Sequence, residues 1–316
     1  MTILSVVLTT RSRPAQLHKT LSLISPFIHS RLLECVIIAQ GDCFEYWQHN
    51  ACGAVVRPFR MTSAWDARNA GILASSGDHT LIFDDDAEFV DEDAVELMMG
   101  VLSAGSVDDV HIFDRGYTSA EGNFISYNAA APAAEIKRSS VLSKTTAWNV
   151  VFPRRLLLAV GLTPPIGVGS KHACQSGEDY LLVRKVLASK WRGTCRYHPD
   201  IRITHPCFYG KTKKELWLCL GYQYGAGYVR VTDRFIGLGR RPLGDMLNAV
   251  VAFLGIIKMV IGLSPGLRPA ERGRGATFTH RVLPAIVRFA GVLDGLSGRL
   301  PRKLIYLRHV VAGNCG

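Results

Sequence analysis

The sequence predicts an α/β fold, in which a mixed, mostly parallel sheet is flanked by helices and followed by a helical C-terminal extension. Short apolar runs rich in β-branched residues alternate with segments whose apolar residues recur at helical spacing. Such alternation favours parallel strands joined by covering helices. In addition, three adjacent aspartates follow one of the strands. Ligands of these sheets lie beyond the carboxyl ends of the strands, so the aspartates mark the predicted functional edge.

The elements follow in chain order from periodicity and from breaking residues. Residues 3–9 form a continuous apolar run, which indicates a buried strand. Pro14 suits the first turn of a helix, and Leu17 and Leu21 recur behind it at helical spacing. Further strands are predicted at residues 35–39, 54–56, 80–83, 110–113 and 201–204, and further helices at residues 64–74, 91–102, 153–160 and 178–188. Residues 161–177, rich in glycine and proline, are predicted to form a loop.

Positive charge is concentrated in the last quarter of the 316-residue chain, whose net charge is +11. Residues 1–229 hold 23 Lys and Arg against 22 Asp and Glu, whereas residues 230–316 hold 14 against 4. The arginines of this quarter stand among apolar residues rather than the aromatic and polar ones that bind nucleic acid, which argues against a nucleic-acid partner. A mean hydropathy of +0.14 is too low for a polytopic membrane protein.

The eight cysteines show neither a CxxC pair nor metal-ligand spacing, so no disulfide framework and no zinc site are predicted. The first residues run directly into an apolar strand, without the basic region, apolar stretch and cleavage site of a secretory signal. A reducing, cytoplasmic setting is therefore expected.

The aspartate triplet consists of Asp84, Asp85 and Asp86. Adjacent carboxylates repel one another and lose hydration, so they are costly unless a cation or strong donors compensate them. In an extended backbone Asp84 and Asp86 project to the same side while Asp85 points away. A hard divalent cation that is bound partly by substrate phosphates fits this pair. The structural alternative is a solvated acidic turn that caps the next helix.

Three blocks of the chain, in order, resemble family 2 glycosyltransferases of the GT-A fold. The first strand and helix are similar at residues 6–14 (VVLTTRSRP). The family's central block resembles residues 67–72 (ARNAGI) and 81–86 (LIFDDD), and its acceptor-side block resembles residues 152–155 (FPRR), 166–169 (IGVG) and 177–184 (GEDYLLVR). The resemblance covers about residues 1–230. It implies a Rossmann-like GT-A sheet and sugar transfer from a nucleoside-diphosphate sugar.

The resemblance also implies a donor site. Asp86 matches the metal ligand, for Mn²⁺ or Mg²⁺, and Asp84 matches the contact to the nucleotide ribose or the metal shell. His205 is similar to a histidine that completes the metal shell in some members, with a structural histidine as the alternative. The residues expected around the donor are Thr9, Arg11, Asp42, Arg68, Asn69, Asp84 and Asp85. Asp42 departs in position from the family's base-reading aspartate, so the nucleotide base is not identified.

The acceptor side is predicted from the ED pair at residues 178 and 179. By resemblance Asp179 is the base that takes the proton of the acceptor hydroxyl, and Glu178 is the next candidate. Both also suit an ordinary acidic helix N-terminus. Trp148 stands where family members line the acceptor pocket, although core packing explains a tryptophan equally well. The implied reaction is a direct displacement that inverts the anomeric carbon.

The C-terminal quarter predicts membrane contact. We expect a catalytic domain at residues 1–235 and a basic, apolar helical extension at residues 236–316. Residues 246–263 are mostly apolar but include Lys258, so a helix lying on the inner face of the cell membrane fits better than a full span. Residues 282–296 are predicted to add an amphipathic helix. Internal packing and a homodimer interface are the structural alternatives.

The expected partners are a nucleoside-diphosphate sugar, a saccharide or lipid-linked acceptor and the cytoplasmic membrane surface. Synthesis of envelope or extracellular polysaccharide is the expected role, with a hexose as the expected sugar class. A non-catalytic sugar-nucleotide-binding or membrane scaffold protein of the same fold is the alternative. A sugar nucleotidyltransferase would need a glycine-rich, arginine-containing phosphate loop after the first strand, and residues 10–14 (TRSRP) do not supply one.

Overall fold

The computed structural model describes residues 3–10, 14–40, 43–60, 64–118, 122–128, 132–136, 141, 144–161, 178–205, 220–221, 224–225, 227–228, 254 and 278–296. The chain divides into two compact units, Met1–Thr163 with Val186–Pro206 and Pro164–Lys185 with Cys207–Gly316. The domain boundary predicted near residue 236 falls outside the described residues.

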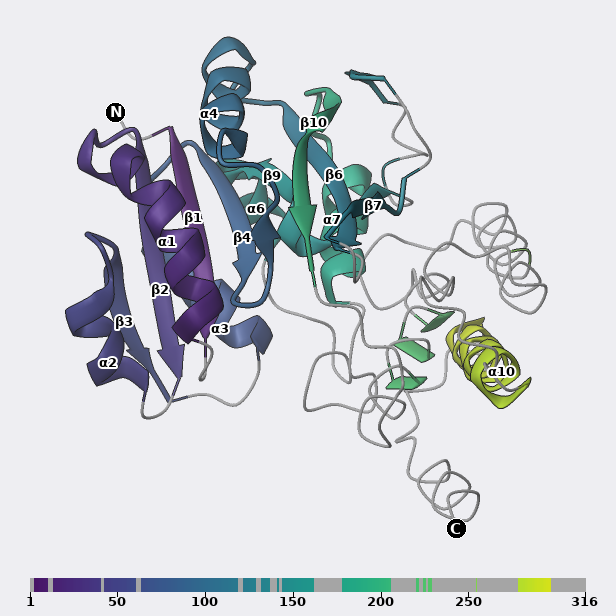
Figure 1. The fold of residues 1–316 in the computed structure, drawn as a ribbon. Helices are drawn as coiled ribbons and strands as arrows, with labels where there is room; N and C mark the ends of the chain where they lie inside the picture. The colour runs from purple at the N-terminus through teal and green to yellow at the C-terminus, as the bar shows by residue number, and fades with distance from the viewer. Residues whose placement is uncertain are drawn as a thin grey trace. The chain divides into compact units, whose positions relative to one another are not determined.

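The first unit is built on a 10-stranded mixed sheet (Figure 1). Its order is β3-β2-β1-β4-β9-β6-β10-β5, with β7 paired to β6 and β8 paired to β10. The strands are β1 Leu4–Thr10, β2 Leu33–Gln40, β3 Val55–Phe59, β4 His79–Asp84, β5 Glu88–Phe89, β6 Val110–Thr118, β7 Phe124–Ser126, β8 Ala134–Glu135, β9 Val150–Pro153 and β10 Cys195–Thr204.

Strand direction decides which chain ends meet at one edge of this sheet. β3, β2, β1 and β4 are mutually parallel. β9 is antiparallel to both β4 and β6, and β10 is parallel to β6. It follows that β1, β4, β6 and β10 all run the same way, and their carboxyl ends lie along a single edge, called the carboxyl edge below. The opposite edge is called the amino edge.

The helices agree with the periodicity of the sequence in most places. They are α1 Pro14–His29, α2 Cys43–Asn50, α3 Ala64–Ala74, α4 Ala94–Ala104, α6 Arg154–Val160, α7 Glu178–Ala188 and α10 Phe278–Leu296, with a 3₁₀ turn, η1, at Ala147–Asn149. The expected helix at residues 153–160 begins one residue later, because Pro153 ends β9. The helix α2 was not predicted, and neither were the short strands β5, β7, β8 and β9.

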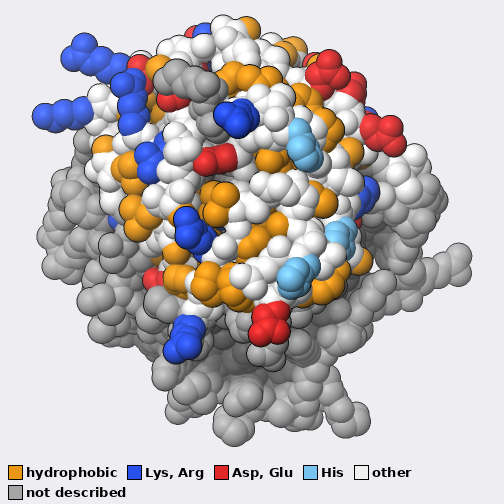
Figure 2. Space-filling model, turned by 90° about the vertical axis from the view of Figure 1, so that its left-hand side faces the viewer, with side chains coloured by type: hydrophobic (Ala, Val, Ile, Leu, Met, Phe, Trp, Pro, Cys, Tyr) orange, Lys and Arg blue, Asp and Glu red, His pale blue; other side chains and the backbone are white. Residues whose placement is uncertain are grey.

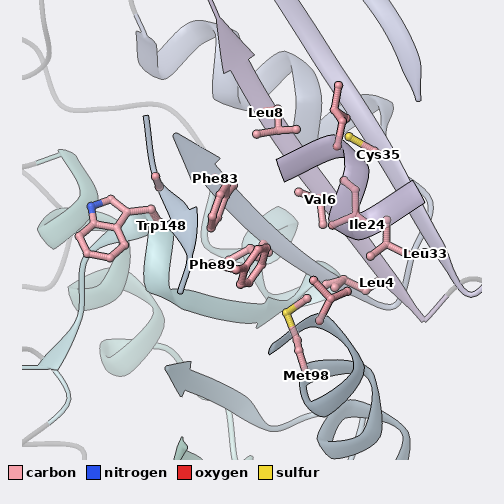
Figure 3. Packing of buried hydrophobic residues seen from close by; sticks show 14 of the residues in the cluster. Leu4, Val6, Leu8, Ile24, Leu33, Cys35, Phe83, Phe89, Met98 and Trp148 are labelled. Atoms are coloured by element: carbon pink, nitrogen blue, oxygen red, sulfur yellow. The ribbon is translucent and has the colours of Figure 1, made fainter. Parts of the chain in front are cut away.

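The main core lies on one face of the sheet, under α1 and α4 (Figure 3). Alternate residues of β1, among them Val6 and Leu8, join Ile24 of α1 and Met98 of α4 in one buried cluster. Phe83 at the end of β4 stacks on Phe89 of β5, with ring centroids 4.9 Å apart. This stacked pair anchors the chain on both sides of the aspartate triplet.

The other face of the sheet is covered by α3, which approaches β1 very closely at a glycine. A Cβ atom at Gly71 would lie 2.2 Å from Cγ1 of Val7, so no larger residue fits there without displacing the helix. Ala67 of the same helix packs in a second cluster with Val36 and Ile38 of β2. These two contacts fix the position of Arg68, which follows Ala67 on the same helix.

β3 forms an edge of the sheet on the side of the molecule seen in Figure 2. Arg57 and Pro58 of this strand are exposed. A proline has no N–H to offer a further strand, and a charged neighbour discourages pairing, so this edge is protected from association. Figure 2 shows hydrophobic, basic and histidine side chains interspersed on this face.

The second unit contains α10, which covers the predicted amphipathic segment 282–296 and begins four residues earlier. A Cβ atom at Gly291 would lie 2.2 Å from the carbonyl oxygen of Tyr224, so the two backbones are in contact there. The hydroxyl of Tyr224 donates to Asp294 at 2.9 Å, and both residues are buried. Of the helices that the structure describes, none has the length and apolar character needed to cross a membrane. Residues 246–263 lie outside the described part except for Leu254.

Candidate active site

Three potential metal ligands meet at the carboxyl edge: Asp84, Asp86 and His205. One ligand atom from each lies within 4.8 Å of the others. The Nε2 atom of His205 is 3.1 Å from Oδ1 of Asp86 and 3.7 Å from Oδ2 of Asp84. Asp86 is 8% exposed, so the cluster is set into the protein rather than displayed on its surface.

The sheet topology explains why residues so far apart in sequence meet. Asp84 is the last residue of β4, and four residues later the chain begins β5, which pairs with β10. In that antiparallel pair Glu88 lies opposite Thr204, the last residue of β10. His205 follows directly, and its backbone N–H donates to the carbonyl of Gly116 on β6 at 3.2 Å. The short β5 strand therefore places the histidine beside the aspartate turn.

Arg68 of α3 adds a permanent positive charge to the cluster. Its Nη2 atom lies 2.5 Å from Oδ1 of Asp84, and the side chain is 8% exposed. Burial raises the pKa of the Asp84 carboxyl, but the guanidinium of Arg68 and the hydrogen bond with His205 outweigh it and hold that pKa well below its usual value. Asp84 is therefore ionised at neutral pH.

His205 responds in the opposite direction. Burial lowers its pKa, but hydrogen bonds to Asp84 and Asp86 and their negative charges raise the pKa to about 10. The protonated ring is thus the counter-charge of the two carboxylates when no cation is bound. A metal ion requires the neutral imidazole, so binding would release this proton.

The donor set fits a divalent metal ion. Two carboxylates and one imidazole offer oxygen and nitrogen ligands, and a nitrogen ligand suits Mn²⁺ better than Mg²⁺, which prefers oxygen. The remaining positions of an octahedral ion would be open to water or to phosphate oxygens. Asp85 is not part of this set, since its Oδ2 accepts a hydrogen bond from Thr10 of β1 at 2.9 Å.

The other predicted donor residues fall into two groups. Thr9 of β1 is the direct neighbour of Asp84 in the β1–β4 ladder, and Asn69 follows Arg68 on α3, so both lie at the carboxyl edge or on the helix that serves it. Arg11 and Asp42 lie outside the described residues. Sequence reasoning missed Thr10, whose hydroxyl holds Asp85, because no motif marks it.

The predicted acceptor-side residues are only partly described. Glu178 and Asp179 begin α7, as expected, but their side chains lie outside what the structure describes, so their roles stay predictions. Trp148 is 6% exposed and belongs to the main core (Figure 3). Its ring stacks on that of His205, with ring centroids 5.2 Å apart. This stacking orients the histidine. A contact between Trp148 and a sugar stays a prediction.

Comparison with known proteins shows the fold. No family model and no curated protein matches the sequence. Residues 1–349 of TarS from S. aureus match in structure with a TM-score of 0.51 and 11% identity, over 95% of this chain and 93% of that one. A longer TarS structure matches with a TM-score of 0.50 and 11% identity, over 94% of this chain and 55% of that one. The chain thus spans about half the length of that longer neighbour.

Two ligand-bound structures are also similar. TarS 1–349 in complex with UDP matches with a TM-score of 0.50 and 14% identity, over 95% of this chain and 93% of that one. Glucosyl-3-phosphoglycerate synthase from Mycobacterium tuberculosis, with Mn²⁺, UDP and phosphoglyceric acid, matches with a TM-score of 0.49 and 17% identity, over 76% of this chain and 80% of that one. The TarS matches confirm the predicted GT-A-type α/β fold, with its mostly parallel sheet flanked by helices.

Proposed function

We propose that this protein is a metal-dependent glycosyltransferase that moves a sugar from a nucleoside-diphosphate donor to a hydroxyl acceptor. The observation that carries the proposal is the cluster of Asp84, Asp86 and His205, which stands at the carboxyl edge of a GT-A-type sheet with Arg68 beside it. TarS, which shares the fold, binds UDP in one of its structures. A UDP-sugar is accordingly the first donor to test.

The proposed mechanism assigns work to the chain's own residues. Asp84, Asp86 and His205 would hold Mn²⁺ or Mg²⁺, which when bound stabilises the negative charge that grows on the departing diphosphate. Arg68 keeps Asp84 ionised and fixes its orientation. Thr10 holds Asp85 away from the ligand set.

Transfer itself is proposed to be a single displacement. The acceptor oxygen forms its bond to the anomeric carbon as the bond to the diphosphate oxygen breaks, and Asp179 takes the proton of the acceptor hydroxyl. The sugar is thereby inverted, and the nucleoside diphosphate leaves with the bonding electrons. Within the proposal, a saccharide or lipid-linked acceptor in polysaccharide synthesis is the preferred class.

The first test is the substitution Asp86→Ala. We expect wild-type protein to be stabilised against heat by UDP with Mn²⁺, and Asp86→Ala to lose that shift because a metal ligand is missing. UDP release from a panel of UDP-sugars should fall on the order of 10²-fold to 10³-fold, the usual effect of removing one electrostatic contact to the transition state.

Glu96→Gln, on the exposed side of α4, serves as the matched control and should keep both readouts. If Asp86→Ala and Asp179→Asn both retained full transfer, the assignment would be wrong. A wild-type protein that UDP with Mn²⁺ stabilises, but that releases no UDP from any sugar donor, would favour the scaffold alternative.

We further propose that the second unit binds an anionic membrane surface through α10, on the cytoplasmic side. On α10, Ile286, Phe289, Leu293 and Leu296 are 57%, 40%, 50% and 48% exposed and recur at helical spacing. Such a stripe is unusual on a soluble surface. The excess of basic residues in residues 230–316 matches the charge of anionic lipid, so a bilayer surface is the occupant that fits.

Vesicle co-sedimentation tests this proposal. The full chain should bind vesicles of phosphatidylglycerol and phosphatidylcholine better than vesicles of phosphatidylcholine alone. The double variant Ile286→Ser with Leu293→Ser should weaken binding about tenfold or more, because it removes two exposed aliphatic side chains that would enter the bilayer surface. Leu73→Ser, at a more exposed leucine on α3, should not weaken binding. Unchanged sedimentation of the double variant, or a shift to a smaller oligomer without any vesicle binding, would overturn the proposal.

A further inference from the structure

A pocket separate from the metal ligands lies on strands β6, β7 and β10. Among its lining residues are Asp114 of β6, Phe124 and Ser126 of β7, Asn128, and Tyr197 and Arg202 of β10. The mechanism proposed above uses none of them, and sequence reasoning did not single them out. All of them belong to the first unit.

Asp114 is held in this pocket by four donors that converge on one oxygen. Its Oδ1 accepts hydrogen bonds from the backbone N–H of Arg115 at 2.9 Å and from Ser126 Oγ at 2.7 Å. Asn128 Nδ2 and Tyr197 Oη each donate to the same atom at 2.9 Å. The residue is only 6% exposed, yet it lines the pocket. Within the described part of the chain no group donates to its other oxygen, Oδ2.

This arrangement is more than is needed to connect three strands. A carboxylate that only braces the sheet would share its donors between both oxygens, as Asp109 does. Oδ1 of Asp109 accepts from Thr194, and its Oδ2 accepts from Arg196 at 2.7 Å. Asp114 instead has all four donors on Oδ1 and leaves Oδ2 for a ligand.

The pocket is close to the metal cluster along the strands. Asp114 lies two residues before Gly116, whose carbonyl accepts the N–H of His205, and Arg202 of β10 is its register partner. At about 3.3 Å per residue, the pocket is on the order of 7 to 10 Å from His205. That spacing suits a group next to the reacting sugar better than a distant regulatory site.

The lining limits the chemistry of the ligand. A carboxylate oxygen accepts hydrogen bonds and does not donate, so it selects hydroxyl or amine groups. Arg202 does not make the pocket a phosphate site, because Nε donates to Asp91 at 2.8 Å and Nη2 pairs with the same carboxylate. The ring of Phe124 lies under the guanidinium of Arg202, 5.6 Å from its carbon to the ring centroid, and adds apolar surface. A fixed carboxylate beside an aromatic ring suits a neutral, hydroxyl-rich ligand.

We propose that this pocket binds the hydroxyl groups of a saccharide acceptor, with Asp114 Oδ2 as the hydrogen-bond acceptor that orients it. The inference rests on the proposed glycosyltransferase function and adds the place and the chemical class of the acceptor. A hydroxyl bound to Oδ2 would fix one sugar ring, while the hydroxyl to be glycosylated extends toward the carboxyl edge. Asp114 is then a specificity-determining residue rather than a proton carrier.

Asp114→Asn is the decisive variant, because it changes only the oxygen in question. The amide oxygen can keep the four donors, while an NH₂ replaces Oδ2. Saturation-transfer NMR with full-length protein, UDP and Mn²⁺ would use a panel of glucose, galactose, mannose, N-acetylglucosamine and their β1,4-linked disaccharides. We expect at least one of these saccharides to bind the wild type. Asp114→Asn should weaken it on the order of tenfold to 100-fold, the usual value of a hydrogen bond to a charged group.

Two further variants keep the test decisive. Asp109→Asn, the same change at a buried carboxylate whose two oxygens are both engaged, should lower stability and leave saccharide binding intact. Phe124→Leu leaves the four donors in place and should weaken saccharide binding even if Asp114→Asn does not fold. Stabilisation by UDP with Mn²⁺ reads the proposed function separately. If it persists while no saccharide binds the wild type, or while Asp114→Asn and Phe124→Leu bind as well as the wild type, the acceptor pocket is refuted and the donor site is not.

Discussion

The pKa of histidine shifts in opposite directions at the carboxyl edge and at the amino edge of the sheet. At the carboxyl edge, His205 lies between two carboxylates, which raise its pKa to about 10. At the amino edge, His79, His111 and His198 lie near the starts of β4, β6 and β10, and burial lowers the pKa of all three. The pKa of His111 falls to about 3. The same side chain is therefore charged at one end of the strands and neutral at the other.

The difference teaches which edge is built for a ligand. The amino-edge rings pack on one another, with His111 and His198 stacked at 5.2 Å and joined through Nδ1 and Nε2 at 3.1 Å. The ring nitrogens of these histidines are buried or bonded within the protein, as expected of residues with a structural role. The carboxyl edge keeps two carboxylates close together and needs external positive charge to balance them. Of the two edges, the carboxyl edge is therefore the one expected to bind a cation.

The largest effect on this comparison is expected from Arg68→Met. It removes the permanent positive partner of Asp84, while His205 stays beside both carboxylates. Breaking a buried pair costs about 3 to 5 kcal/mol, and since Asp84 keeps 18% exposure and a second partner we expect roughly 2 to 3 kcal/mol. Urea unfolding at neutral pH measures this loss, and Mn²⁺ should restore more stability to the variant than to the wild type.

An exposed ion pair near the amino edge supplies the control. Arg155 of α6 pairs with Asp108, just before β6, and their side chains are 65% and 40% exposed. Solvent screens such a pair, so Arg155→Met should change the unfolding free energy by less than about 1 kcal/mol. It should also leave the response to Mn²⁺ unchanged. Equal losses for the two arginine variants would contradict the view that the carboxyl edge carries the unbalanced charge.

Much of the fold could be predicted because most of the helices and strands are marked by the local pattern of apolar residues and by the breaking residues that flank them. The bounds of α3 and α7 match the predicted 64–74 and 178–188, since helical spacing and clear breakers mark both. α2 was missed because its residues have almost no net hydrophobic character and bury only Trp47. β9 was missed because a four-residue strand inserted between β4 and β6 is specified by its neighbours rather than by its own pattern.

The residues of the candidate site also differ in whether a local pattern marks them. Asp84 and Asp86 could be found because they follow a buried strand directly and alternate in direction. The contact between His205 and Asp86 depends on β5, two residues long, which no periodicity reveals. Asp114 was invisible for a similar reason, because its donors come from β6, β7 and β10 and meet only through the register of the sheet. Long-range pairing, rather than composition, decides such positions.

The smallest effect is expected from the amino-edge histidines and takes the form of a pH dependence. Because their pKa values are lower in the folded protein than in the unfolded chain, the unfolded chain binds more protons below about pH 6.5. This contribution to the free energy of unfolding is fully present above that pH and is lost as the pH falls toward the pKa values of the folded protein. The nearby carboxylates of Asp78, Asp109 and Asp200 reduce the loss, and Arg196 increases it. We expect the unfolding free energy to fall by about 1 to 2 kcal/mol for His111 between pH 6.5 and 4.5.

The variant His111→Phe separates this effect from general acid sensitivity. It keeps a ring in the buried position but cannot take up a proton, so the slope of unfolding free energy against pH should flatten by about one proton even if the variant is less stable overall. His49→Gln, at an exposed position on α2, should leave the slope as it is in the wild type. Urea unfolding at a series of pH values measures all three proteins. A slope unchanged by His111→Phe would mean that the amino edge admits the charge that its burial is expected to exclude, and the contrast between the two edges would then fail.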